Sequence, residues 1–134
     1  METALKILVV DDESGILLMC QQLLELSSYE VLTATEAEQA LAIAAEQKID
    51  LLLTDIRLPA MDGFTLIQRI KAIQPEIAVV VMTGYNTVET AIKALRSGVD
   101  GLLIKPYELG SEFLDIIRQA LENNRRKRDT VSLR

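Results

Sequence analysis

Short apolar runs along this chain alternate with longer segments in which apolar residues recur every three or four positions. The runs cover residues 5–10, 30–34, 50–54, 77–82 and 100–104, and each has the length and composition of a buried strand. The segments between and after them, such as 14–26 and 109–121, have helical spacing. Five strands alternating with five helices predict an α/β fold built from right-handed βαβ units, with one parallel sheet and helices on both faces.

Local signals place several helix ends. Thr35 is followed three residues later by Glu38, a spacing that predicts a capping box at the start of the second helix. Asn86 and Glu89 have the spacing of an N-cap residue and the third residue of the fourth helix, and Gly98 is expected to end that helix.

The absence of histidine from all 134 residues restricts the chemistry. The chain cannot be a phosphohistidine donor, build a Ser-His-Asp triad or offer imidazole to zinc. Cys20 is the only cysteine, so no intramolecular disulfide can form, and we expect a buried, inert thiol there. Any catalysis must rely on carboxylates, lysine, hydroxyl groups or a metal.

The charge of the chain is uneven. The net charge is −6, but residues 125–134 hold five of the 14 basic side chains and one of the 20 acidic ones, which leaves −10 on the first 124 residues. A domain this acidic is a poor ligand for nucleic acid. No apolar stretch reaches the roughly 18 residues of a membrane span, and the N-terminus does not resemble a signal peptide. We expect a soluble, cytoplasmic protein of one domain that binds neither nucleic acid nor membrane directly.

Polar residues follow four of the five apolar runs, and parallel strands bring those ends to one edge of the sheet. They are Asp11, Asp12, Asp55, Thr83 and Lys105. Carboxylates 4 Å apart repel each other by about 1 kcal/mol per pair in water and by several-fold more in a partly buried site. A hard divalent cation such as Mg²⁺ relieves that repulsion and commonly works beside a phosphate. Lysine and threonine can bind anionic oxygens, so the set predicts a phosphoryl site with a carboxylate inside it.

Four motifs in this order resemble the receiver domain of bacterial two-component response regulators. They are the acid pair of the first loop, DIRLPAMDG from Asp55, MTG from Met82 and KP from Lys105. The resemblance covers roughly residues 5–122. It implies a flavodoxin-like (CheY-like) doubly wound sheet of order 2-1-3-4-5. We assign residues 1–124 to this domain and residues 125–134 to a basic tail or the start of a linker.

The resemblance also implies roles for these residues. Asp55 would accept a phosphoryl group from a sensor histidine kinase or a histidine phosphotransfer protein. Asp11 and Asp12 would hold Mg²⁺ together with Asp55 and the backbone carbonyl of Arg57. Lys105 would pair with the phosphoryl oxygens, and Thr83 would swing to bind them. The domain would then act as a phosphorylation-dependent switch, and not as an enzyme with turnover on a free substrate.

Leu102 departs from the family pattern. Receivers often carry an aromatic residue three positions before the lysine, whose rotamer couples to the threonine, and Leu102 stands there instead. Tyr107 lies beyond the lysine, at a different position, and does not replace the missing aromatic residue. Arg57 and Tyr85 occupy positions that tune the loss of the phosphoryl group in this family. Both are bulky, which predicts slow autodephosphorylation.

Two other functions stay open from the sequence. One is a receiver fold that binds its partners constitutively. The intact set of Asp12, Asp55, Thr83 and Lys105 argues against it, and Leu102 keeps it open. The other, which we disfavour, is a Mg²⁺-dependent phosphohydrolase with an aspartyl-phosphate, because such enzymes usually need a second acid where Arg57 stands. The sequence also leaves open the cognate kinase, the output domain or protein, a homodimer through the last two helices, and whether the domain stands alone.

Overall fold

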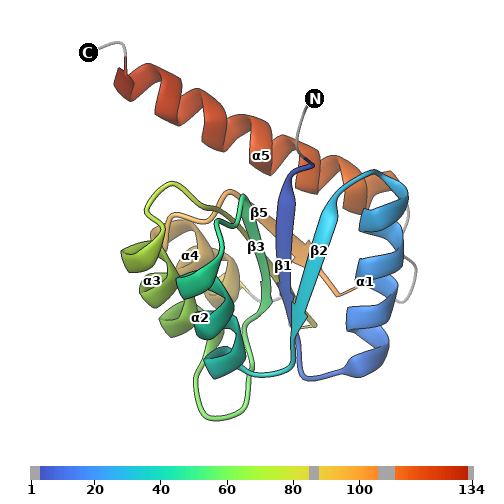
Figure 1. Ribbon diagram of the computed structural model, residues 1–134. Coiled ribbons are helices and arrows are strands. Elements are labelled where there is room, and N and C mark those ends of the chain that lie inside the picture. The colour runs from blue at the N-terminus through green and yellow to red at the C-terminus, as the bar shows by residue number, and fades with distance from the viewer. Residues whose placement is uncertain (1–3, 85–87, 106–110, 133–134) are drawn as a thin grey trace.

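The computed structural model describes residues 4–84, 88–105 and 111–132. Strands and helices alternate along this part of the chain (Figure 1). The strands are β1 (Lys6–Val10), β2 (Glu30–Ala34), β3 (Leu51–Asp55), β4 (Ala78–Thr83) and β5 (Gly101–Ile104). The helices are α1 (Ser14–Leu26), α2 (Ala37–Glu46), α3 (Gly63–Ile73), α4 (Val88–Arg96) and α5 (Ser111–Ser132).

The described strands form one parallel sheet in the order β2-β1-β3-β4-β5, which confirms the predicted topology. Helices α1 and α5 cover one face, and α2, α3 and α4 cover the other (Figure 1). Successive residues of a strand point to opposite faces, so Leu52 packs towards α2 and α3 while Leu51 and Leu53 pack towards α1 and α5. All three are fully buried. This two-sided burial explains why the central strands are continuously apolar.

The start of α2 differs from the prediction. The N-cap residue is Glu36, and its side chain makes no capping hydrogen bond, so the proposed capping box of Thr35 and Glu38 is wrong. Gln39 is the third helical residue, and its Oε1 accepts from Thr35 N at 2.8 Å and from Thr35 Oγ1 at 3.0 Å. The helix begins one residue later than the capping box requires, which places Gln39 where Glu38 was expected.

The end of α4 follows the prediction, whereas α5 continues farther than expected. Gly98 has a φ of +72° just after α4, the left-handed conformation that commonly ends a helix. The N-cap assigned to Asn86 lies outside the described residues. Helix α5 runs to Ser132, so residues 125–132 of the stretch assigned to a basic tail or the start of a linker continue the last helix. Arginine and lysine are good helix formers, and Arg126 lies 3.9 Å from Glu122 one turn earlier.

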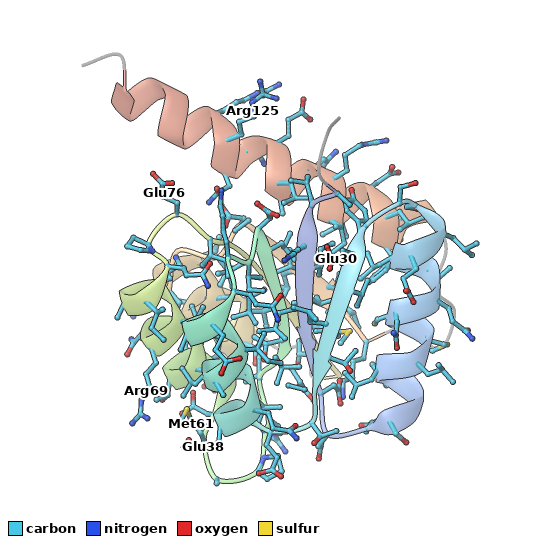
Figure 2. The ribbon with its side chains drawn as sticks, in the orientation of Figure 1. Glu30, Glu38, Met61, Arg69, Glu76 and Arg125 are labelled. Atoms are coloured by element: carbon cyan, nitrogen blue, oxygen red, sulfur yellow. The ribbon has the colours of Figure 1, made fainter. Side chains whose placement is uncertain are left out.

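Charged side chains cover the outside of these helices. In Figure 2, Arg69 of α3 points into solvent, and Arg125 of α5 points away from the sheet. The buried polar or charged residues of the described chain are instead Asp11, Thr54, Asp55 and Thr83. All four lie at or just after the carboxyl ends of β1, β3 and β4, so buried polarity is concentrated at one edge of the sheet.

Candidate functional site

The carboxyl edge of the sheet brings together the acids that the sequence selected. Asp55 is the last residue of β3, and Asp11 and Asp12 follow β1. Because β1 and β3 are neighbours, one carboxylate oxygen from each acid lies within 4.8 Å of the others. Asp11 and Asp55 are buried, and Asp12 is exposed. The predicted carboxylate cluster is therefore present.

Asp55 is held from two sides. Its Oδ1 accepts a hydrogen bond from Arg57 N at 3.1 Å, which folds the chain back just after the strand. Its Oδ2 lies 2.8 Å from Lys105 Nζ, and 8% of the Asp55 side chain is exposed. The carboxylate is thus held by both oxygens and only slightly exposed.

Asp11 is more deeply buried than Asp55. Its Oδ1 accepts from Glu13 N at 2.9 Å, whereas its Oδ2 accepts no hydrogen bond from the described residues and has only an ion contact with Lys105 Nζ at 3.1 Å. Burial raises the pKa of Asp11, and the nearby charge of Asp55 acts in the same direction. This oxygen is a buried acceptor that can still bind a cation.

Lys105 carries the positive charge of the cluster. Its ammonium lies near three carboxylates, at 2.8 Å from Asp55, 3.1 Å from Asp11 and 3.1 Å from Glu13. Burial acts to lower the pKa of Lys105, but the hydrogen bonds to these acids outweigh it and raise that pKa. Lys105 is therefore a permanent cation placed directly on the Asp55 carboxylate.

The loop after Asp55 is built by tight turns. Asp62 caps α3, since its Oδ1 accepts from Thr65 N at 2.9 Å, and this bond lowers the pKa of Asp62. Gly63 N donates to Ile56 O at 2.6 Å. A Cβ on Gly63 would collide with the backbone oxygen of Asp55 and lie 2.8 Å from Ile56 Cα. Only glycine allows α3 to start this close to the strand end.

The acid cluster fits a hard divalent cation. Asp11, Asp12 and Asp55 supply carboxylate oxygens, which Mg²⁺ and Ca²⁺ prefer, and Asp11 Oδ2 is buried without a hydrogen bond from the described residues. With Glu13 the cluster has four carboxylates, and three of them, those of Asp11, Glu13 and Asp55, share the ammonium of Lys105. The cluster therefore keeps a net negative charge that a cation would neutralise.

Thr83 is buried at the end of β4, beside a recess of about 390 Å³. Arg57, Phe64, Thr90 and Lys93 also line this recess, and Lys93 Nζ lies 4.8 Å from the centre of the Phe64 ring. A larger groove of about 980 Å³ lies at the opposite edge of the sheet, between α5 and the α3–β4 loop, and holds none of these residues. Of the two hollows, only the smaller recess is lined by predicted site residues, Thr83 and Arg57.

A family model for the response regulator receiver domain matches residues 7–122. The chain belongs to this family. Receiver domains of response regulators are signalling modules, so the predicted class of function, phosphorylation-dependent two-component signalling, is confirmed.

Relatives in sequence and in structure agree with this assignment. The transcriptional regulatory protein ZraR of Escherichia coli is 44% identical over 102 residues, which are 76% of this chain and 23% of that protein. PrrA of Mycobacterium tuberculosis is 34% identical over 107 residues, 80% of this chain and 46% of that protein. The chain spans about a quarter of the length of the first curated relatives it matches. A CheY-like receiver domain from Methanospirillum hungatei superposes with a TM-score of 0.85 at 31% identity, covering 93% of this chain and 99% of that one.

A further solved structure shows a modified relative. It is a response regulator from Burkholderia pseudomallei with a phosphorylated aspartic acid, a calcium ion and citrate. It is 27% identical to this receiver, and the two superpose with a TM-score of 0.77 over 96% of this chain and 74% of the relative.

Leu102 of this receiver is half-buried and packs against the core beneath α2, α3 and α4. Thr83 pairs in register with Ile104, two residues farther along β5. Tyr85 and Tyr107 lie outside the described residues. The expected departure at residue 102 is thus a packed aliphatic side chain on the face that carries α4.

Glu13 is the site residue that sequence reasoning missed. It completes the acidic triplet after β1, and its Oε1 lies 3.1 Å from Lys105 Nζ across 92 positions of sequence. A signal existed, because Glu13 stands at a helix N-cap, where glutamate is not among the preferred residues. A poor cap residue beside a charged cluster indicates another role.

Proposed function

We propose that this receiver accepts a phosphoryl group on Asp55. The observation that carries the proposal is the Lys105 ammonium 2.8 Å from the Asp55 carboxylate, inside a cluster with Asp11 and Asp12. The acceptor oxygen is fixed, a cation stands beside it, and the surrounding acids suit a metal. Phosphoryl transfer depends mainly on such positioning and charge neutralisation.

The proposed step moves one phosphoryl group. A carboxylate oxygen of Asp55 attacks phosphorus and forms an acyl phosphate, while the P–N bond of a donor phosphohistidine breaks. The bonding electrons stay on the imidazole nitrogen, which takes up a proton when one is required. These 134 residues contain no histidine, so the donor phosphohistidine lies outside them, on a sensor histidine kinase or a histidine phosphotransfer protein.

Asp11, Asp12 and Asp55 would hold Mg²⁺, together with the backbone carbonyl of Arg57. The metal would neutralise charge on the phosphoryl oxygens. The calcium ion and phosphorylated aspartic acid of the Burkholderia pseudomallei relative support this assignment, because calcium is also a hard cation with oxygen ligands. Lys105 would exchange its contact with Asp55 for a phosphoryl oxygen, and Thr83 would turn to donate its hydroxyl.

The modification would act as a switch. A phosphoryl group adds about two negative charges at neutral pH, which draws Lys105 and Thr83 inward and biases the surface near α4 towards a second state. The output would be a changed affinity for another domain or protein. We place this module in the cytoplasm and assign it no turnover on a free substrate.

The test is incubation with acetyl phosphate and Mg²⁺ followed by intact mass measurement. We expect a gain of one phosphoryl group that is absent in Asp55→Asn and absent when the metal is chelated. Continuous phosphate release without an adduct would favour a phosphohydrolase. If no adduct formed and no phosphate was released, the proposal would be overturned, and a constitutive binding module would be the remaining function.

The lifetime of the adduct tests the role of Arg57. This bulky side chain follows two residues after the acceptor and lines the recess beside Thr83, where it can restrict the approach of water. We expect the phosphoryl group to persist for minutes or longer, measured by mass after removal of the donor. A lifetime of only seconds would contradict this expectation.

A further inference from the structure

We propose that Glu13 is a positioning residue that holds the Lys105 ammonium in place for phosphoryl uptake. This inference rests on the proposed function of Asp55. Glu13 Oε1 lies 3.1 Å from Lys105 Nζ, on the side of the cluster that faces solvent, where 61% of the Glu13 side chain is exposed. The other two acids beside Lys105 are buried, with 0% of the Asp11 side chain and 8% of the Asp55 side chain exposed. Glu13 is therefore the outermost of the three.

The backbone position of Glu13 is unusual for its side chain. Glu13 is the N-cap residue of α1, yet its side chain makes no capping hydrogen bond. Ser, Thr, Asp or Asn at this position would bond to the free N–H groups of the first turn. Glu13 instead directs its carboxylate to a lysine after β5. Helix α1 therefore lacks a side-chain cap from Glu13, and Lys105 has the Glu13 carboxylate as an ion-pair partner.

Glu13 also fixes a second member of the cluster. Its backbone N donates to Asp11 Oδ1 at 2.9 Å, while its side chain accepts from Lys105. One residue therefore links the buried acid and the ammonium into a single arrangement. A change in the Glu13 side chain removes the second link and leaves the first intact.

The three partners of Lys105 have different fates in the proposed reaction. An ammonium has three N–H donors, and Asp55, Asp11 and Glu13 are the three acids beside it. When Asp55 becomes an acyl phosphate, only the donor directed at Asp55 must move to a phosphoryl oxygen. Glu13 and Asp11 can keep their contacts throughout, and they hold Nζ within reach of the incoming group.

Two effects of the Glu13 charge have opposite signs, so they can be separated. As an anchor for Lys105, Glu13 speeds uptake. As a negative charge near the acceptor, it repels an anionic donor and slows uptake. An exposed ion pair is typically worth about 0.6 kcal/mol, so the anchor should change the rate by about threefold.

Glu36 is a matched control. It is also a glutamate at a helix N-cap, follows β2 at the same edge of the sheet and makes no capping hydrogen bond. It forms no ion pair within the described part of the chain. Glu36→Ala therefore removes the same charge from the same kind of position without touching Lys105.

The experiment measures phosphoryl uptake from acetyl phosphate at saturating Mg²⁺. We expect Glu13→Ala to slow uptake about threefold, Glu13→Gln to slow it less because the amide oxygen still accepts from Lys105, and Glu36→Ala to leave it unchanged or slightly faster. Faster uptake in both Glu13 variants would show that only the charge acts. That result, or equal rates for Glu13→Ala and Glu36→Ala, overturns the proposal.

A second readout does not depend on phosphorylation. The Lys105 ammonium signal in a ¹H–¹⁵N NMR spectrum, assigned by its loss in Lys105→Met, should shift or broaden in Glu13→Ala and stay unchanged in Glu36→Ala. If the wild-type protein took up no phosphoryl group, the function proposed for Asp55 would fail while this spectrum still tested the anchor. An unchanged Lys105 signal in Glu13→Ala would show that Glu13 does not position the ammonium.

Discussion

Aspartates stand at both edges of the sheet, but their surroundings differ. At the amino edge, Asp50 Oδ2 accepts from Lys6 N and Asp100 Oδ2 accepts from Val79 N, each at 2.8 Å. At the carboxyl edge, Asp11 and Asp55 lie beside each other and share Lys105. The first pair completes the backbone hydrogen bonding of neighbouring strands. The second pair concentrates negative charge where the strands end.

The difference shows what makes an acid available for chemistry. A carboxylate that accepts from a backbone N–H replaces a missing hydrogen bond of the sheet, and its removal affects stability. Carboxylates that face one another repel, and they depend on a lysine or a metal to stay close. The same residue type therefore serves the fold at one edge and stands ready for the proposed reaction at the other.

The largest expected effect comes from removing Lys105, the cation that Asp11 and Asp55 share. Lys105→Met leaves two buried carboxylates without their counter-charge, and loss of one partner of a buried ion pair destabilises strongly. We expect the free energy of unfolding in the absence of Mg²⁺ to fall by about 3 kcal/mol, measured by urea denaturation. The control is Lys71→Met, because the one hydrogen bond of Lys71 Nζ to the described residues is to the exposed Gly98 carbonyl, at 3.1 Å. Equal losses for the two variants would contradict the account.

The next largest effect is expected at Gly63, which packs against the backbone of Asp55 and Ile56. Gly63→Ala places a methyl group against the Asp55 carbonyl and Ile56 Cα. We expect a loss of roughly 2 kcal/mol in unfolding free energy and reduced phosphoryl uptake, because the strand end must shift. Gly15 has open space around its missing Cβ, so Gly15→Ala in α1 should be neutral or stabilising. A Gly63→Ala variant as stable as wild type would show that the loop relaxes freely.

The amino edge should respond in stability alone. Asp50→Ala removes the acceptor of the Lys6 N–H, and we expect a loss of about 1.5 kcal/mol with an unchanged rate of phosphoryl uptake per folded molecule. Asp50→Asn keeps an oxygen that can accept and should recover most of the stability. Slower uptake in either variant would mean that the two edges are coupled.

Asp62 belongs to the carboxyl edge but behaves like the acids of the other edge. Its bonds from Thr65 stabilise the ionised carboxylate and lower the pKa of Asp62 below 3.8. Asp62→Ala should therefore lower the unfolding free energy by about 1 kcal/mol at neutral pH. A group with a lowered pKa loses its contribution as pH falls through that pKa, so the gap between variant and wild type should close below pH 3.8. Urea denaturation at neutral pH and below pH 3.8 tests this. A difference in unfolding free energy between Asp62→Ala and wild type that persists in acid would contradict it.

The sequence predicted the fold because each strand is short, apolar and bounded by clear turn residues. The run before Asp55 and the charge-free run before Thr83 each indicate a strand buried on both faces. With the strand order implied by the family resemblance, this was enough to bring Asp11, Asp55 and Lys105 to one edge. The structure placed these residues together as expected.

The sequence failed where a side chain chooses among partners that local spacing does not reveal. Thr35 has Glu38 and Gln39 nearby, and only the true helix start selects Gln39. Glu13 and Lys105 are 92 positions apart, so no local pattern connects them. The continuation of α5 through Arg126 escaped prediction because an exposed polar helix has no apolar periodicity.

The strand order also has a consequence for synthesis of the chain. Asp11 and Asp55 lie at the ends of the adjacent strands β1 and β3, so these two acids come together as soon as β3 has paired with β1. Lys105 is made about 50 residues later, a delay of several seconds at the usual pace of a ribosome. A β1–β3 pair formed in that interval would hold its acids without the lysine that later compensates them. Cellular cations are the counter-charge available to it until the last strand docks.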